Sequence, residues 1–403
     1  MSTALCAIGR QLDDRASLGR ALDELLAGRT EPPALLALGE PTHGIEAFPV
    51  LRNDILAHLV ERGYRSIILE TDHFAAAVVG DYVNGSDTDL DTVLSIGFSH
   101  GFGAIPGSRE LLEWLRAANE DRDPRDRIHF YGFDAPTEYS GAPSPRQFLA
   151  DAIDYLPSAF RPESLPDIGA LCGADADWTN QAAMYDAAAS IGGSAQAHTL
   201  RLVADELVSV LHRAGPTLRP ADPGGYDHAF ARARTGLALL RYHSAMATPA
   251  TDRIGTLAGH RTEMMADNLL SILARERHRG PSLVFAHNAH LQRARPHPQS
   301  GADAPTWGSA GALAALTLGD RYLFVAADAN PTADPGTMHH LLAQATTRRA
   351  LFPVPALLAA LPPAAQSAKP FLLGHIPFGP ADLTSADAII FITDTDGTRH
   401  QYW

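Results

Sequence analysis

The 403-residue sequence has little of three things: cysteine, positive charge and long apolar runs. Its two cysteines, Cys6 and Cys172, lie far apart in the chain, which excludes a disulfide framework and a paired-cysteine metal site. Unpaired cysteines are usually buried as small apolar side chains, and we expect both to be buried here. Their scarcity fits a protein of the reducing cytoplasm.

The chain also has few positively charged residues. The chain has 32 Lys and Arg against 46 Asp and Glu, a formal net charge of −14. This balance argues against nucleic acid and anionic membranes as partners, because both attract clustered cations. No uncharged apolar run approaches the ~18 residues of a membrane span. The N-terminal stretch, MSTALCAIGRQLDDRAS, also lacks the basic start and apolar core of a secretory signal, so we expect a cytoplasmic protein.

Short apolar runs predict a set of buried parallel strands. The helical pattern at 48–63 should end at Gly63, and another should begin with Ser108 as its cap. Alternation of such runs with helical patterns predicts an α/β fold with a mostly parallel central sheet and flanking helices. The predicted strands are 34–39, 66–70, 128–133, 282–287 and 322–328.

The chain changes character between residues 144 and 275, where it is alanine-rich and helical in period. We expect this stretch to be an inserted helical lobe that forms one side of a cleft. Residues 1–143 and 276–403 would then be the two parts of the α/β catalytic core. Proline-rich joints mark the tail, which contains one strand-like run at 386–393.

Titratable residues follow the predicted strands. In open α/β sheets, ligands bind beyond the carboxyl ends of the strands. A single carboxylate there commonly caps a helix or forms a surface ion pair. Burying a whole set without a task would be costly, so together they predict an acid–base site. In chain order they are Glu40 and His43, Glu70 and Asp72, Asp134, and His287, Asn288 and His290, with Arg52 and Arg261 as basic candidates.

The first of these sites lies in LALGEPTHG, residues 36–44. Pro41 disfavours the helical conformation at Glu40, so Glu40 and His43 should lie on a fixed turn instead of on successive turns of a helix. We expect Gly39 to allow the chain to turn.

Six motifs in order resemble the erythromycin esterase family, over about residues 30–330. The resemblance implies an erythromycin esterase-like fold and hydrolysis of a macrolide lactone or another small-molecule ester by direct attack of water, with no cofactor and no metal. Antibiotic resistance and natural-product biosynthesis are the implied settings. The motifs are GEPTHG (39–44) followed by Arg52, LETD (69–72), ELLEWLRAAN (110–119), FYGFDA (130–135), HRTEMMADNL (260–269) and AHNAHL (286–291).

The resemblance also implies roles. His43 would be the general base, oriented by Glu40, with Glu70 as a second carboxylate of the water site and His287 as its second histidine. A neutral histidine has the right pKa to take a proton from water near neutral pH, and a carboxylate stabilises the resulting imidazolium.

Two arginines, Arg52 and Arg261, would hold carboxylates in place or face the developing oxyanion, since their charge is permanent. The residues predicted to bind substrate are Asp72, Asp134, His290, Asn288 and His100. The segment 94–108 lacks the tryptophan-containing stretch associated with the family, and Thr262 stands where an aspartate is common. These departures leave room for a natural product other than a macrolide.

Several alternatives remain. GFSHG (97–101) matches the serine-esterase pattern around Ser99, although the following FGAIPG would not start the required helix; this loop could instead cover the pocket as a lid. The same acid–base groups could serve a lyase, a cyclase or a non-catalytic binding protein. A monomer is expected. A metal-dependent hydrolase would draw its Zn²⁺ or Mn²⁺ ligands from Glu40, His43, Glu70, His287 and His290.

Overall fold

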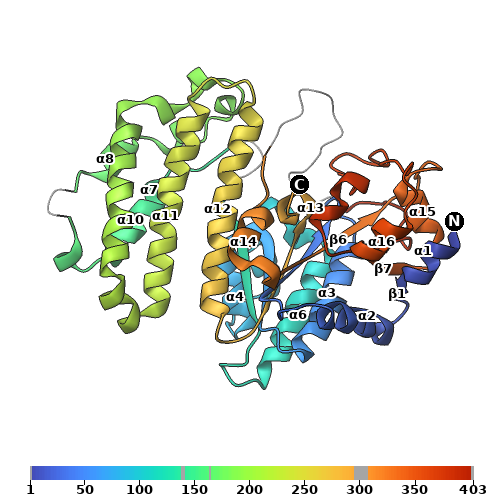
Figure 1. Cartoon of the computed structure of the whole chain (residues 1–403). Coiled ribbons are helices and arrows are strands. Elements are labelled where there is room, and N and C mark those ends of the chain that lie inside the picture. Colours follow the sequence, from blue (N-terminus) through green and yellow to red (C-terminus); the bar gives the residue numbers. More distant parts are fainter. Residues whose placement is uncertain (1, 138–140, 163–164, 295–306, 401–403) are drawn as a thin grey trace. The chain divides into compact units, whose positions relative to one another are not determined.

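The chain divides into two compact units, residues 1–134 with 265–403 and residues 135–264 (Figure 1). The structure is a computed structural model, and it describes residues 2–137, 141–162, 165–294 and 307–400. Both divisions fall earlier than the expected limits at 143 and 275. The second falls inside helix α12 (Arg253–Glu276), because the helix from Met265 onward packs in the core of the α/β unit.

One mixed sheet forms the centre of the α/β unit. Among the described residues its order is β1-β7-β8-β6-β2-β5-β3-β4, with parallel pairing from β8 to β4 and antiparallel pairing at the β1 edge. The predicted mostly parallel sheet is confirmed. The strands are β1 (Arg10–Gln11), β2 (Leu35–Glu40), β3 (Ser66–Asp72), β4 (His129–Asp134), β5 (Ser282–His287), β6 (Tyr322–Ala329), β7 (Arg349–Pro353) and β8 (Ala388–Ile392).

Both faces of the sheet are covered, which explains why the strands are continuous apolar runs. Leu36 and Leu38 of β2 belong to one core, and Leu35 and Ala37 to the other. The first core includes residues of α2 (Arg15–Ala27), α3 (Ala47–Glu61), α4 (Ala76–Val83), α5 (Leu90–Ile96) and α6 (Pro106–Glu120). The second includes residues of α1 (Ser2–Ile8), α12, α13 (Asn288–Leu291), α14 (Ala310–Leu318), α15 (Met338–Gln344) and α16 (Val354–Ala360).

Helix limits follow the local sequence in one case and not in another. Helix α3 ends at Glu61, and Gly63 follows with φ of 91°, as predicted. Helix α6 begins at Pro106, so the prediction that Ser108 caps it is wrong. Proline is favoured in the first turn of a helix, and it starts this one two residues before Ser108.

The second unit has an apolar core of its own, built from helices. Cys172 is buried in it, whereas Cys6 of the other unit is exposed, so the expectation of two buried cysteines is wrong for Cys6. No described helix combines the length and apolarity needed to cross a bilayer. The described α-helices that lie wholly within this unit are α7 (Arg146–Tyr155), α8 (Ile168–Cys172), α9 (Asp175–Trp178), α10 (Ala195–Ala221) and α11 (Pro223–Met246).

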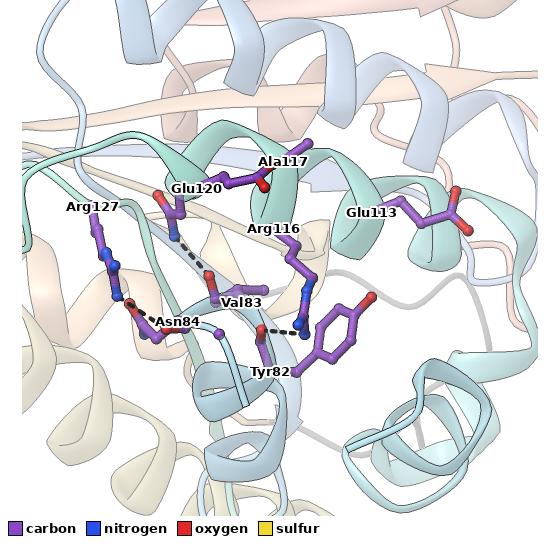
Figure 2. A pocket seen from close by; sticks show the side chains of 10 residues that line it. Tyr82, Val83, Asn84, Glu113, Arg116, Ala117, Glu120 and Arg127 are labelled. Atoms are coloured by element: carbon purple, nitrogen blue, oxygen red, sulfur yellow. Dashed lines mark hydrogen bonds between the residues drawn. The ribbon is translucent and has the colours of Figure 1, made fainter. Parts of the chain in front are cut away.

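Asn119, the last residue of the ELLEWLRAAN motif, ties helix α6 to α4 and β4. Its buried amide nitrogen donates to the carbonyl oxygens of Val83 (3.1 Å) and Ile128 (2.9 Å), and its amide oxygen accepts from the Ile128 N–H (2.8 Å). Figure 2 shows the adjacent cleft, where Arg116 donates to the carbonyl of Tyr82. The polar groups of this cleft therefore hold the end of α4.

Replacing Asn119 by alanine should lower the free energy of unfolding by about 2–4 kcal/mol, because buried backbone groups of Val83 and Ile128 lose their partners. Urea denaturation followed by circular dichroism measures the change. Glu113→Ala, an exposed position on the same helix, is the control and should change it by less than about 0.5 kcal/mol. Equal midpoints for the two variants would contradict this role of Asn119.

Candidate active site

Three neighbouring parallel strands, β2, β5 and β3, bring the first predicted residues together. Glu40 at the end of β2 lies opposite His287 at the end of β5, and Leu69 of β3 lies opposite Phe285 of β5. Carboxyl ends of parallel strands meet at one sheet edge, so Glu70 lies beside this pair.

Glu40 is the last residue of β2 and His43 lies in the turn between β2 and α3, so neither is on a helix, as Pro41 predicts. The expected role of Gly39 is different: it is a strand residue, and a Cβ built there would lie only 2.0 Å from Asn288 Oδ1. Gly39 thus permits close packing. The turn itself uses Gly44, whose φ is 86°.

His43 is held at Nδ1 by Glu40, and its other ring nitrogen lies near Glu70. Its Nδ1 is 2.8 Å from Glu40 Oε1, which places a proton on Nδ1 when the carboxylate accepts and leaves Nε2 as the basic nitrogen. Nε2 is 3.6 Å from Glu70 Oε1. The His43 side chain is 19% exposed, against 7% for Glu40 and 5% for Glu70, so His43 is the most exposed of the three.

Glu70 is the centre of a second set of contacts. Its Oε2 accepts the backbone N–H of His287 (2.8 Å), and its Oε1 is 3.2 Å from His290 Nε2. Glu70 therefore lies between the Nε2 atoms of His43 and His290. His290, predicted to bind substrate, joins the acid–base group in the structure.

The two carboxylates change the pKa of His43. Burial alone lowers that pKa, but the charge of Glu70 and the hydrogen bond and charge of Glu40 outweigh burial and raise it. Burial also raises the pKa of Glu40, against the effect of the His43 hydrogen bond. His43 is therefore a stronger base than an isolated histidine.

His287 has hydrogen bonds within the protein at both ring nitrogens. Its Nε2 donates to the carbonyl oxygen of Pro41 (2.8 Å), and its Nδ1 accepts the N–H of Ala289 (3.0 Å). Burial lowers the pKa of His287 to about 3, so the ring is neutral at physiological pH. The ring therefore contacts the Pro41 carbonyl, while the backbone N–H of His287 donates to Glu70, and its predicted role as the second histidine of the water site stays a prediction.

Arg52 is buried near Glu40 and Glu70. Its guanidinium donates to the carbonyl of Gly107 (2.7 Å) and to Asn53, and it lies over the ring of Phe285. Burial lowers its pKa to about 10, which keeps it cationic. Arg52, Glu40 and Glu70 line a cavity of about 30 Å³, large enough for water but not for a bulky ligand. Arg52 thus acts on Glu40 through its charge, without a direct hydrogen bond.

Two of the residues predicted to bind substrate form a buried pair. His100 Nε2 is 2.9 Å from Asp134 Oδ2, and Asp134 is fully buried. His100 adopts a left-handed conformation (φ 59°) in the short helix η1 (Ser99–Ala104), and its ring lies against Phe102, which in turn contacts the ring of His43. The pair therefore supports the wall beside His43.

Asp72 and Asn288 have structural contacts instead of exposed ones. Asp72 Oδ1 accepts the N–H groups of Phe74 and Ala75, both at 2.7 Å, and so holds the turn between β3 and α4. Asn288 is buried and donates to the carbonyl of Ala327. For these two residues the structure favours packing over substrate binding.

The serine-esterase alternative fails on geometry. Ser99 Oγ accepts the N–H of Asp72 (2.8 Å) and contacts Thr71 Oγ1, and no histidine among the described residues is hydrogen-bonded to it. Helix α5 precedes Ser99, where a nucleophile elbow requires a strand. Ser99 thus anchors η1 to the end of β3.

A three-ligand cluster does occur, but away from the predicted metal ligands. Among the residues that the structure describes, the side chains with ligand atoms close enough to share an ion are Asp328, His339 and His375. Arg261 lies on α12 within residues 135–264, and its predicted role stays a prediction.

The model of the erythromycin esterase family matches residues 59–367. This chain belongs to the erythromycin esterase family. Glu70, His287 and His290 lie within the match, while the Glu40–His43 turn precedes it.

Solved structures share the erythromycin esterase fold. A Bacillus cereus protein superposes with a TM-score of 0.71 at 16% identity, over 97% of this chain and 96% of that one. A mutant of erythromycin esterase EreC in its open conformation has a TM-score of 0.66 at 20% identity (94% and 93%). A succinoglycan biosynthesis protein has 0.65 at 14% (97% and 95%). At these low identities the superpositions show a shared fold. The family and the fold together support the assignment of this chain as a hydrolase.

In this erythromycin esterase family member, Glu70→Gln should lower the pKa of His43, because Glu70 provides the largest charge that raises it. Nitrogen-15 NMR titration of the histidine rings measures that pKa, with His43→Gln identifying the signal. Glu110→Gln, an exposed carboxylate on α6, is the control. An unchanged His43 pKa in Glu70→Gln would contradict the assigned coupling.

Proposed function

We propose that this protein is an ester hydrolase in which His43 activates a water molecule directly. One observation carries the proposal: His43 is held by Glu40 at Nδ1, and its Nε2 side lies near Glu70 on a partly exposed ring. A histidine that one carboxylate orients and whose ring is partly exposed is an arrangement suited to proton abstraction.

The proposed reaction has two steps. Water adds its oxygen to the ester carbonyl carbon while His43 Nε2 takes its proton, forming a tetrahedral intermediate. Collapse of the intermediate breaks the carbon–oxygen ester bond, and the imidazolium returns the proton to the leaving alcohol. Glu40 stabilises the imidazolium through Nδ1, and His290 and Glu70 hold the water.

The oxyanion needs positive charge or hydrogen-bond donors. Arg52 donates to the Gly107 carbonyl and Asn53 beneath the carboxylates, so it contributes its field. The proposed substrate is a macrolide lactone or another natural-product ester, in keeping with the family.

His43→Ala should lower kcat/KM for ester hydrolysis by about 10²–10⁴-fold, the usual contribution of a general base. Ser99→Ala should lower it by less than about tenfold, because Ser99 only anchors η1. Steady-state kinetics with intact macrolides and small aryl esters measures both. An active His43→Ala variant, or equal losses in the two variants, would exclude this mechanism.

Isotope labelling distinguishes hydrolysis from the other classes of reaction. In oxygen-18 water, hydrolysis places the label in the new carboxylate. Loss of water or rearrangement without label would instead support a lyase or cyclase. Activity that is lost with a chelator and restored by Zn²⁺ or Mn²⁺ would support the metal-dependent alternative.

A further inference from the structure

A buried carboxylate, Asp328 at the end of β6, gathers four hydrogen-bond donors. Its Oδ2 accepts from His339 Nε2 (2.7 Å) and from the backbone N–H of Phe378 (2.7 Å). Its Oδ1 accepts from His375 Nε2 (3.0 Å) and from the N–H of Ala329 (2.7 Å). Both histidine side chains are fully buried. Each carboxylate oxygen therefore has two donors, which compensates for burying the charge.

The donors come from elements far apart in sequence. His339 belongs to α15, whereas His375 and Phe378 belong to an irregular segment between α16 and β8. Asp328 therefore fixes that segment at two points, His375 and Phe378.

Between those two points lies a contact with the candidate active site. The N–H of Ile376 donates to the carbonyl oxygen of Pro41 (3.0 Å). The same oxygen accepts from His287 Nε2 (2.8 Å). Pro41 is the residue between Glu40 and the rest of the turn that carries His43. The Asp328 cluster is thus one hydrogen bond away from the proposed catalytic turn.

The cluster resembles a metal site by composition, but its hydrogen bonds favour another reading. His375 Nδ1 accepts the backbone N–H of Phe371 (3.2 Å), so the ring proton is on Nε2. A metal ion at Nε2 would require that proton to leave, while Nδ1 is still occupied as an acceptor. Both Asp328 oxygens also have two donors already.

We propose that His375 is a positioning residue for the active site: it locks residues 375–378 onto Asp328, and Ile376 then holds the Pro41 carbonyl in line with His287. This inference rests on the proposed function of His43 as the base. It adds a part of the chain that the acid–base set does not include. Small displacements of a catalytic group cost much of its rate, so this restraint acts on kcat more than on KM.

His339 offers a matched comparison. It donates to the same carboxylate from α15, but none of its hydrogen bonds leads to Pro41. Loss of either histidine should destabilise the cluster, because Asp328 loses one donor in each case. Only loss of His375 should also release the Pro41 turn.

The experiment compares His375→Ala, His375→Gln and His339→Ala in the full chain. The first readout is the nitrogen-15 NMR signal of His287 in the protein without substrate, which reports the Nε2 hydrogen bond to Pro41. The second is kcat and KM for ester hydrolysis, and the third is the urea midpoint. Glutamine can place its amide nitrogen near the original Nε2 and donate to Asp328, so it should restore most of the wild-type behaviour.

We expect His375→Ala to shift the His287 signal and to lower kcat about 10–100-fold with a smaller change in KM. His339→Ala should lower the urea midpoint but leave the His287 signal in place and kcat within about threefold. An unchanged His287 signal in His375→Ala, or the same shift in His339→Ala, would overturn the proposal. So would stoichiometric metal in the purified protein that requires all three side chains.

The His287 signal also distinguishes a failure of the proposed function from a failure of the positioning role of His375. If no ester is hydrolysed, the proposed function fails, and the NMR comparison in the substrate-free protein still decides whether His375 positions the turn. If the esterase is active but the His287 signal is indifferent to His375, only the positioning role fails.

Discussion

The parallel pairing of β2 with β5 determines the geometry on which the rest of the site depends. Its register places Glu40 level with His287. His287 then has one nitrogen used by Ala289 and donates through the other to Pro41, while its own N–H donates to Glu70. A shift of register would separate His287 from Pro41 and Glu70, because these two interactions join residues of different strands or of the turn after one. The positions of these residues are therefore fixed by the pairing of the strands.

The chemistry at this edge depends on carboxylates that are buried yet not isolated. Glu40 and Glu70 lie close to the same histidine, and a buried charge is costly unless it is hydrogen-bonded. His43 and a backbone N–H provide hydrogen bonds, His290 Nε2 lies 3.2 Å from Glu70, and the charge of Arg52 lies nearby. The arrangement raises the pKa of His43 and keeps the pKa of His287 low, so two neighbouring histidines have opposite roles.

Sequence reasoning found the strands and the turn because both depend on local chemistry. Apolar runs predict buried strands, and Pro41 alone disfavours a helical Glu40. It missed β1 and β7, since β1 has two residues and β7, RALFP, begins with a charge and ends with proline. It placed the start of α6 at Ser108, where a capping residue is available, although Pro106 begins the helix. Gly39 was expected to turn the chain, but it makes room for Asn288 of helix α13.

The amino-acid sequence by itself determined the fold class, the order of the strands along the chain and which residues could exchange protons. Only the tertiary structure decided how the surroundings of these residues differ. His287 and His290 lie three residues apart, yet one is buried with both nitrogens occupied and the other reaches Glu70. Asp328 and His375 gave no signal in the sequence, because their contact depends on how the segment after α16 folds back onto β6. Burial and hydrogen bonding set the pKa and the role of a side chain, and both come from residues distant in sequence.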